Sequence, residues 1–397
     1  MNKEGKFLKI MYYQKDNNQN RALRNVTQQN IEIKNPDKIL SIVVFFLVVI
    51  GIMSVFSASV PKAVNAGYFP LHFTLIQLGA VIMGYIGYRI LSNFDYKKLV
   101  YVTNGFAIFV IAMLIYVLVK GDVINGAQRW ISLGPVSIQP SEFAKPAIVL
   151  LLAKVFSKDA NLLDSKKWSS FLLIMIMVLL IFKQPNLSMV MLLFFTSVAM
   201  YLSAGGSFKL IGFGLLSVFG LGGLGTLLQP YQLQRIKIWL NPEVDPLGAG
   251  YNIIQSMVAF ASGNLCGCGY GASKQKLAWL PEAHTDFIFA VIGEEMGFIG
   301  CIFLIGLFWT VLCRGFMIAT KCPDMYGKLL AIGLTFSITC QAFINMSVAS
   351  SMFPATGVPL PFISYGGSSV FITLCMIGII LNISRTKVQT IRIRQYV

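Results

Sequence analysis

Long apolar stretches with few charged residues recur along the chain and alternate with short polar segments. A helix needs about 20 mostly apolar residues to cross the roughly 30 Å hydrocarbon core of a membrane. On this measure the pattern predicts ten membrane-spanning helices. They lie at about residues 39–57, 72–91, 99–119, 141–157, 168–182, 187–204, 208–228, 286–313, 328–352 and 363–384.

The predicted helices form a single membrane domain, residues 39–384, between two polar tails. Residues 1–38 are rich in Asn, Gln and Lys, and we expect them to form a mobile tail, whereas residues 385–397 form a short basic tail. The largest segment outside the membrane is the loop 229–285, between the seventh and eighth predicted helices. The expected fold is therefore an all-α integral membrane protein with one large external loop.

Composition and charge support this interpretation. Of the 397 residues, 56% are hydrophobic and only 12% are charged, whereas soluble domains carry about 25% charged residues. This argues against a soluble enzyme, a disordered protein and a disulfide scaffold. The net charge is +16, and Lys and Arg concentrate in alternate segments, chiefly 1–38, 89–98, 154–167, 314–328 and 385–394. The positive-inside rule assigns these segments and both termini to the cytoplasm, so topology accounts for the basic balance without a nucleic-acid partner.

Four polar stretches interrupt the apolar pattern, and in this topology all four approach the external face. An ionisable side chain at the centre of a membrane helix costs at least about 2.5 kcal/mol, so these residues must face protein or water. In the first stretch Arg129 adjoins Trp130, a pair that suits phosphate oxygens or a membrane-interface anchor. In the second, Glu142 and Lys145 share a helical face. They fit either a fold-stabilising ion pair or a site for an anionic substrate.

The other two stretches precede predicted helices. Glu282, His284 and Asp286 crowd three ionisable groups where an apolar helix begins. Asp286 could cap that helix, but a cap does not need such neighbours, so we favour a functional role. Residues 357–369 contain prolines and glycines that prevent a regular helix at membrane depth. The free backbone N–H groups and hydroxyls of that segment, including Ser368, could bind an anion, although a plain loop also fits.

Five motifs in order carry a resemblance to the SEDS family of integral-membrane peptidoglycan polymerases. They are Ala-Gln-Arg-Trp-Ile at 127–131, Gln-Pro-Ser-Glu-Phe-Ala-Lys at 139–145, Leu-Pro-Glu-Ala-His-Thr-Asp-Phe-Ile-Phe at 280–289, Gly-Glu-Glu at 293–295 and Pro-Leu-Pro-Phe-Ile-Ser-Tyr-Gly-Gly-Ser-Ser at 359–369. The match runs from about residue 38 to 384. Ala283 and residues 273–277 are more similar to the division branch, FtsW, than to the rod-elongation branch, RodA. Asn186 stands where the family usually has Asp.

The resemblance implies a reaction and a set of site residues. The substrate would be lipid II, a disaccharide-pentapeptide on undecaprenyl diphosphate, polymerised into glycan strands at the outer membrane face during cell division. Asp286 matches the essential Asp of the family and would be the general base that activates the attacking sugar hydroxyl. A diphosphate can leave without being protonated if cations neutralise its charge. The reaction therefore needs one carboxylate as general base and cations at the diphosphate, but no second carboxylic acid. The implied substrate-binding residues are Arg129, Trp130, Glu142, Lys145, His284 and Ser368.

The resemblance also implies partners and a location. A divalent cation, Mg²⁺ or Mn²⁺, could share the diphosphate charge, and we expect no nucleotide or organic cofactor. Family members act with a class B penicillin-binding protein, a transpeptidase, and with other division proteins. The expected location is the bacterial plasma membrane, or the envelope of a peptidoglycan-walled plastid. Two other functions stay open, a lipid II flippase and a non-catalytic division scaffold.

Overall fold

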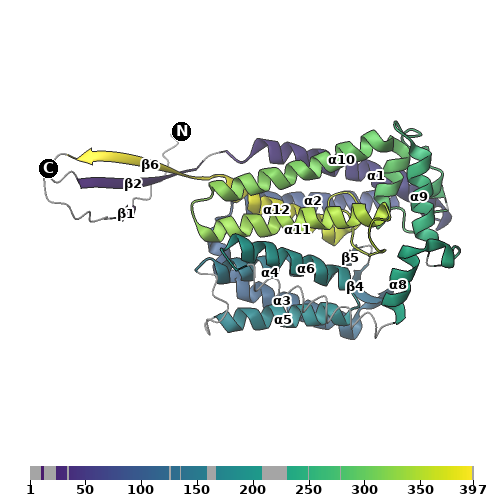
Figure 1. Cartoon of the computed structure of the whole chain (residues 1–397), viewed down its shortest axis with the longest axis horizontal. Helices are drawn as coiled ribbons and strands as arrows, with labels where there is room; N and C mark the ends of the chain where they lie inside the picture. The colour runs from purple at the N-terminus through teal and green to yellow at the C-terminus, as the bar shows by residue number, and fades with distance from the viewer. Residues whose placement is uncertain are drawn as a thin grey trace.

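The structure is a computed structural model that describes residues 10–12, 24–33, 35–124, 127–134, 136–158, 167–207, 230–248, 250–277 and 279–395. Long helices run side by side along one direction, and a narrow sheet extends from one end of the bundle (Figure 1). Two further helices, α8 and α9, lie at the opposite end (Figure 1). The molecule therefore has two distinct ends, a tail end and a loop end.

Within the described residues, nine helices correspond to nine of the ten predicted spans. They are α1 (Lys38–Asn65), α2 (His72–Asn93), α3 (Leu99–Lys120), α4 (Pro140–Phe156), α5 (Trp168–Lys183), α6 (Leu187–Ser203), α10 (Ile288–Lys321), α11 (Met325–Ala349) and α12 (Gly367–Ser384). In the same residues, α1, α2, α3, α10, α11 and α12 are long and apolar enough to cross a membrane. The predicted span 208–228 lies outside the described residues, so the count of ten stays a prediction.

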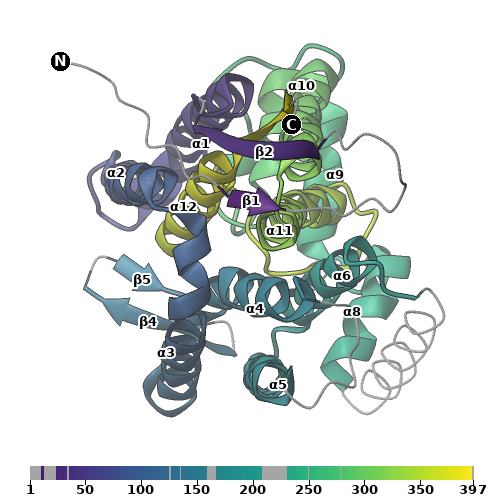
Figure 2. The same cartoon turned by 90° about the vertical axis from the view of Figure 1, so that its left-hand side faces the viewer.

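The helices differ in how deeply they are enclosed. In α11 and α12, 78% and 72% of the apolar window is buried, against 11% in α2. Viewed along the bundle, α11 and α12 lie among the other spans, whereas α2 lies at the edge (Figure 2). Gly84 of α2 permits close packing on α12, because a Cβ atom there would lie 2.6 Å from Leu374 Cδ1. The exposed apolar side chains of outer helices such as α2 suit contact with lipid.

The predicted external loop 229–285 is largely structured. It contains α8 (Pro230–Leu240), α9 (Tyr251–Gly263) and two short 3-10 turns, η3 (Pro242–Val244) and η4 (Gln275–Leu277). Two adjacent carboxylates of α10 hold its last part. Glu294 accepts a hydrogen bond from the Lys274 backbone N–H over 2.9 Å, and Glu295 forms a buried 2.7 Å ion pair with Lys276. These two acidic residues therefore anchor the loop.

Helix α10 is interrupted at Gly297, whose φ of 67° is non-helical. The loop after α9 hydrogen-bonds to the backbone groups around this break. Cys268 N donates to Glu294 O over 2.9 Å, and Phe298 N donates to Asn264 O over 2.9 Å. Irregular backbone in a membrane helix is tolerated when protein groups satisfy it in this way. The first segment of α10, which follows Asp286, is thus fixed to the loop.

Two small sheets complete the fold. At the loop end, β3 (Asp122–Ile124), β4 (Ala127–Leu133) and β5 (Val136–Ile138) form an antiparallel sheet between α3 and α4. At the tail end, β1 (Ile10–Tyr12), β2 (Arg24–Ile33) and β6 (Thr386–Gln395) pair in the order β1-β2-β6. Residues 24–33 thus form a strand for which the C-terminal tail supplies a complete antiparallel partner, and the mobility expected of the N-terminal tail stays a prediction. Both tails leave the bundle at the same end.

Candidate active site

Asp286 lies in the turn directly before α10. The N-cap residue of α10 is Phe287, and its side chain makes no capping hydrogen bond. The neighbouring Thr285 hydroxyl donates to the Glu282 carboxylate over 2.9 Å. Within the described residues, the half-buried Asp286 carboxylate accepts no hydrogen bond and forms no ion pair. A capping role for Asp286, the plain alternative in the sequence, is therefore excluded.

The Asp286 carboxylate faces Arg129 across a glycine. A Cβ atom at Gly357 would lie 3.6 Å from Asp286 Oδ2 and 3.7 Å from Arg129 Nη1. Because Gly357 lacks that atom, the space between the carboxylate and the guanidinium stays open. A carboxylate and a cation on two sides of one small space can act on the same reactant.

The backbone of another segment holds the Arg129 guanidinium in place. Arg129 belongs to β4, and its Nε donates to Gln184 O over 2.8 Å while Nη2 donates to Pro185 O. Asn186 begins α6, where its side chain accepts from Met189 N over 3.3 Å. The segment between α5 and α6 therefore orients Arg129. Asn186 serves as a helix cap there.

Arg235 of α8 is a second cation near Asp286, and the sequence analysis did not single it out. Its Nη1 donates to Ala355 O over 3.0 Å, which holds α8 against the segment that leads to Gly357. Its positive charge acts on the Asp286 carboxylate together with that of Arg129. In the sequence, Arg235 is a single Arg in a short amphipathic segment. Such residues are common on protein surfaces that have no function, so the pattern did not indicate a site.

Burial and Glu282 raise the pKa of Asp286 to about 7, and the charges of Arg235 and Arg129 oppose this rise. The burial cost of the charged form is the largest of these effects. A carboxyl group with a pKa near neutrality is suited to accept a proton during catalysis, because it is partly deprotonated and yet basic. Strongly perturbed acids of this kind are more common at functional sites than elsewhere.

His284 lies on the other side of the same turn. The Lys62 Nζ atom lies 3.3 Å from His284 Nε2 and 3.8 Å from the Glu282 carboxylate. The ring packs against Tyr365, with the centroids 5.7 Å apart. Burial and Lys62 lower the pKa of His284 to about 4, against the effect of Glu282. The imidazole is therefore neutral near pH 7.

Glu142 and Lys145 form a closed pair inside the bundle. Both are almost fully buried on α4, and Lys145 Nζ lies 2.6 Å from Glu142 Oε2. Lys145 also donates to the Gln341 side chain, whose Nε2 donates to Pro359 O over 2.8 Å. The pair is therefore linked through Gln341 to the backbone of the irregular segment 357–366.

The other two predicted site residues are Trp130 and Ser368. Trp130 adjoins Arg129 on β4, where successive side chains point to opposite faces. Ser368 near the start of α12 accepts a 3.2 Å hydrogen bond from Gln139 N and so joins α12 to α4. The structure thus brings Asp286, Arg129 and His284 to one end of the bundle, while Glu142, Lys145 and Ser368 bind to protein groups.

A buried amide that the sequence analysis missed connects the two halves of the site. Asn345 Nδ2 donates to Asp286 O over 2.9 Å and to Val358 O over 2.8 Å. This fixes the turn that carries Asp286 relative to the segment that carries Gly357. A buried Asn in an apolar helix is unusual enough to have been a signal.

The described side chains around Asp286 do not match the ligand set that the expected divalent cation would need. In the part of the chain that the structure describes, no group of three or more His, Cys, Asp or Glu side chains could hold a metal ion. The charges that surround Asp286 are largely guanidinium groups, which repel a cation. The described residues therefore do not form a metal site by themselves.

Comparison with known proteins gives close relatives over most of the chain. Stage V sporulation protein E of Bacillus subtilis (strain 168) is 38% identical over 365 residues, 88% of this chain and 97% of that protein. The probable peptidoglycan glycosyltransferase FtsW of Trichlorobacter lovleyi is 38% identical over 354 residues, 88% of this chain and 93% of that protein. A chain from a solved structure on polymerization and crosslinking by a peptidoglycan synthase complex matches with a TM-score of 0.73 and 29% identity, covering 88% of this chain and 98% of that one.

The fold and the site together define a multi-pass membrane protein that gathers a carboxylate and two guanidinium groups at one end of its bundle. Residues 37–389 match the family model FTSW_RODA_SPOVE, described as cell cycle protein. The chain belongs to this family, which confirms the resemblance that the five motifs carry.

Proposed function

We propose that the chain is a peptidoglycan glycosyltransferase that polymerises lipid II into glycan strands at the outer face of the plasma membrane during cell division. The observation that carries this proposal is the open space at Gly357, with the Asp286 carboxylate on one side and Arg129 on the other. Several relatives are named as probable peptidoglycan glycosyltransferases, and all three of these, including the one from Trichlorobacter lovleyi, carry the division name FtsW.

In the proposed reaction, Asp286 takes the proton from the 4-hydroxyl of an acceptor N-acetylglucosamine. The oxygen then attacks the anomeric carbon of the donor N-acetylmuramic acid, and the bond from that carbon to the diphosphate oxygen breaks. Undecaprenyl diphosphate leaves with the electron pair of that bond. Arg129 and Arg235 stabilise its charge, since preformed cations act strongly where negative charge develops. The pKa of about 7 leaves a useful fraction of Asp286 deprotonated at neutral pH.

The test is polymerisation of purified lipid II by the reconstituted full chain, read as glycan-strand length on a gel. We expect Asp286→Asn to lower the rate by about 10²- to 10⁴-fold, the usual contribution of a general base. Glu243→Gln is the matched control, because this carboxylate is exposed on η3 of the same external segment. Strand synthesis at the wild-type rate by Asp286→Asn would refute the assignment.

The same preparation separates the alternative functions. Labelled lipid II that crosses the bilayer without strand formation would favour a flippase. Neither movement nor strands, even with a transpeptidase partner added, would favour a scaffold. We include a class B penicillin-binding protein in the proposal, because the solved relative comes from a structure on coordinated polymerization and crosslinking. Assays with and without Mg²⁺ or Mn²⁺ would show whether a divalent cation assists the diphosphate.

The proposed orientation places the Asp286 end outside the cell and both tails in the cytoplasm. Cys266 and Cys268 are exposed at the Asp286 end and provide natural labels. A membrane-impermeant maleimide added to intact cells should modify the wild type, and the modification should fall when both are changed to Ser. Reaction only after the cells are opened would reverse the topology.

A further inference from the structure

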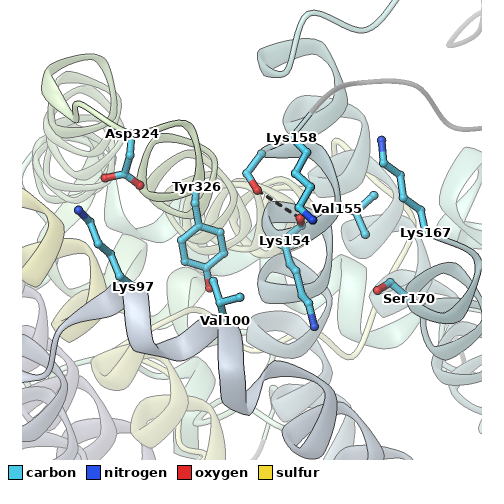
Figure 3. Close-up of a pocket in the computed structure, with 10 residues that line it drawn as sticks. Lys97, Val100, Lys154, Val155, Lys158, Lys167, Ser170, Asp324 and Tyr326 are labelled. Atoms are coloured by element: carbon cyan, nitrogen blue, oxygen red, sulfur yellow. Dashed lines mark hydrogen bonds between the residues drawn. The ribbon is translucent and has the colours of Figure 1, made fainter. Parts of the chain in front are cut away.

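A pocket of about 640 Å³ lies at the tail end of the bundle, opposite the candidate active site. It opens where α3 and α11 begin, after η1 (Tyr96–Lys98), and where α4 ends and α5 begins. Figure 3 shows Lys97 and Asp324 on one side of it, Lys167 and Ser170 on the other, and Lys154 between them. Its volume is typical of sites that bind small ligands or headgroups.

The pocket is strongly basic. Four lysines line it: Lys97 from η1, Lys154 and Lys158 at the end of α4, and Lys167 at the start of α5. Within the described residues, the first three form no ion pair. Among the residues that the structure describes, Lys154 Nζ donates to the neutral Asn104 side chain, over 3.0 Å. A basic cavity between membrane helices attracts an anionic group.

The acidic residue of the pocket, Asp324, is engaged elsewhere. One of its carboxylate oxygens caps α11 by accepting from Gly327 N over 2.8 Å. The other accepts from the Tyr96 hydroxyl. The carboxylate therefore fixes the start of α11 to η1, and among the described lining residues its one negative charge stands against the positive charges of Lys97, Lys154 and Lys158.

Exposed aromatic residues place this pocket at the level of the lipid headgroups. Tyr101, beside the lining residue Val100, is 87% exposed, and Trp168, beside Lys167, is 67% exposed. Tyr and Trp in such positions are typical of the boundary between hydrocarbon and water. The lining also contains Val100 and Val155, which suit the glycerol and upper acyl portion of a lipid.

We propose that this pocket binds the phosphodiester headgroup of an acidic phospholipid from the leaflet on the side of the chain termini. The lysines neutralise the phosphate, and the two valines contact the apolar part below it. This site is separate from the candidate active site, and its assignment does not depend on the proposed function.

The test uses the full chain, reconstituted in bilayers that contain phosphatidylcholine and phosphatidylglycerol. After mild extraction, native mass spectrometry measures how much of each lipid stays bound. The pocket variant combines Lys97→Gln, Lys154→Gln and Lys158→Gln. Each removed lysine should weaken retention of phosphatidylglycerol roughly fivefold, while phosphatidylcholine changes little.

The matched control removes the same charge from the same end of the bundle outside the pocket, through Lys38→Gln, Lys321→Gln and Lys328→Gln. It should retain phosphatidylglycerol as the wild type does. A second pocket variant changes only the two exposed lysines, Lys97 and Lys158, so it tests the site if the triple variant fails to fold. We expect it to lose part of the retention.

Three results would overturn the proposal. Equal loss in the pocket variant and in the control would indicate diffuse attraction by the whole basic end. Displacement of the lipid by an equal concentration of inorganic phosphate would indicate a site for a soluble anion. Preferential displacement by a polyprenyl diphosphate would assign the pocket to a diphosphate lipid instead of an acidic phospholipid.

Discussion

Glu142 and Asp286 are two of the carboxylates that lie near a cation, and the difference in their surroundings separates a structural role from a chemical one. Glu142 is completely buried and lies 2.6 Å from Lys145. Asp286 is half-buried, and a Cβ atom added at Gly357 would contact both its carboxylate and the Arg129 guanidinium. The first pair is closed and leaves no room for a reactant, whereas the second is open.

This difference shows that the sequence alone does not reveal whether a charged residue in a membrane protein has a structural or a catalytic role. Both carboxylates belong to family motifs, and both precede or begin an apolar helix. A closed ion pair offsets much of the cost of burial and stabilises the fold. The Asp286 carboxylate forms no ion pair within the described residues, and the cost of its burial raises the pKa of Asp286 to about 7.

The largest effect should come from breaking the closed pair. Glu142→Gln leaves the Lys145 ammonium buried without its partner, which costs about 3–5 kcal/mol of stability. We expect a large drop in the unfolding temperature, measured by the thermal unfolding of the purified protein. Replacing both residues, Glu142→Leu with Lys145→Met, should recover most of the loss, because no buried charge remains. Full stability with lost polymerisation in Glu142→Gln would instead make Glu142 part of the chemistry.

The open site should respond to a single methyl group. The added Cβ in Gly357→Ala would make ordinary contacts of 3.6 and 3.7 Å with Asp286 and Arg129, so the fold should survive. It would occupy the space for the reacting group, and we expect a loss of about 10²-fold in polymerisation, the scale of a small misplacement of reactants. The measurement is kcat/KM for lipid II.

Gly67→Ala is not a suitable control for this change, because Gly67 has a positive φ of 74°. Gly306→Ala is suitable, since no atom lies within 4 Å of the added methyl group. It should leave activity unchanged, and because Ala is the better helix former it should not lower stability. If Gly357→Ala were as active as Gly306→Ala, the space at Gly357 would not be the reaction centre.

The smallest effect should be a shift in pH dependence. Glu282 raises the pKa of Asp286, so Glu282→Gln should lower it. Because the base acts when deprotonated, kcat/KM should rise with pH through about 7 in the wild type and through a lower pH in the variant. His284, with a pKa of about 4, titrates well below this range.

The pH profile distinguishes this effect from a structural one. Loss of the contact between Glu282 and Thr285 would lower the rate equally at every pH and leave the midpoint where it was. Glu243→Gln should show the wild-type midpoint. A midpoint that moved to higher pH in Glu282→Gln would contradict the assigned charge interaction.

Much of the fold was predictable, because the apolar pattern of a membrane helix is local. The segments that became α2 and α3 were predicted within a few residues of their bounds. The pattern missed the strands at residues 24–33 and 386–395, since pairing between the two tails joins the ends of the chain. It also missed α8 and α9, whose mixed composition resembles that of a loop.

The site was predictable only in part. Glu282, His284 and Asp286 are neighbours in the sequence, so their crowding was visible there. Arg235 and Asn345 were not identified, because each stands alone in its own segment and meets Asp286 only through folding. Glu294 and Glu295 also belong to a family motif, yet they anchor the loop after α9.

By itself, the sequence determined that this chain is a multi-pass membrane protein, because the cost of burying charge in hydrocarbon leaves a direct mark on composition and spacing. Its motifs also determined the family. Only the tertiary structure decided which buried charges are paired and which are open, since that depends on atoms from distant segments that meet within a few ångströms. Asp286 and Arg129 come close to Gly357 only because the turn before α10, strand β4 and the segment before α12 pack together.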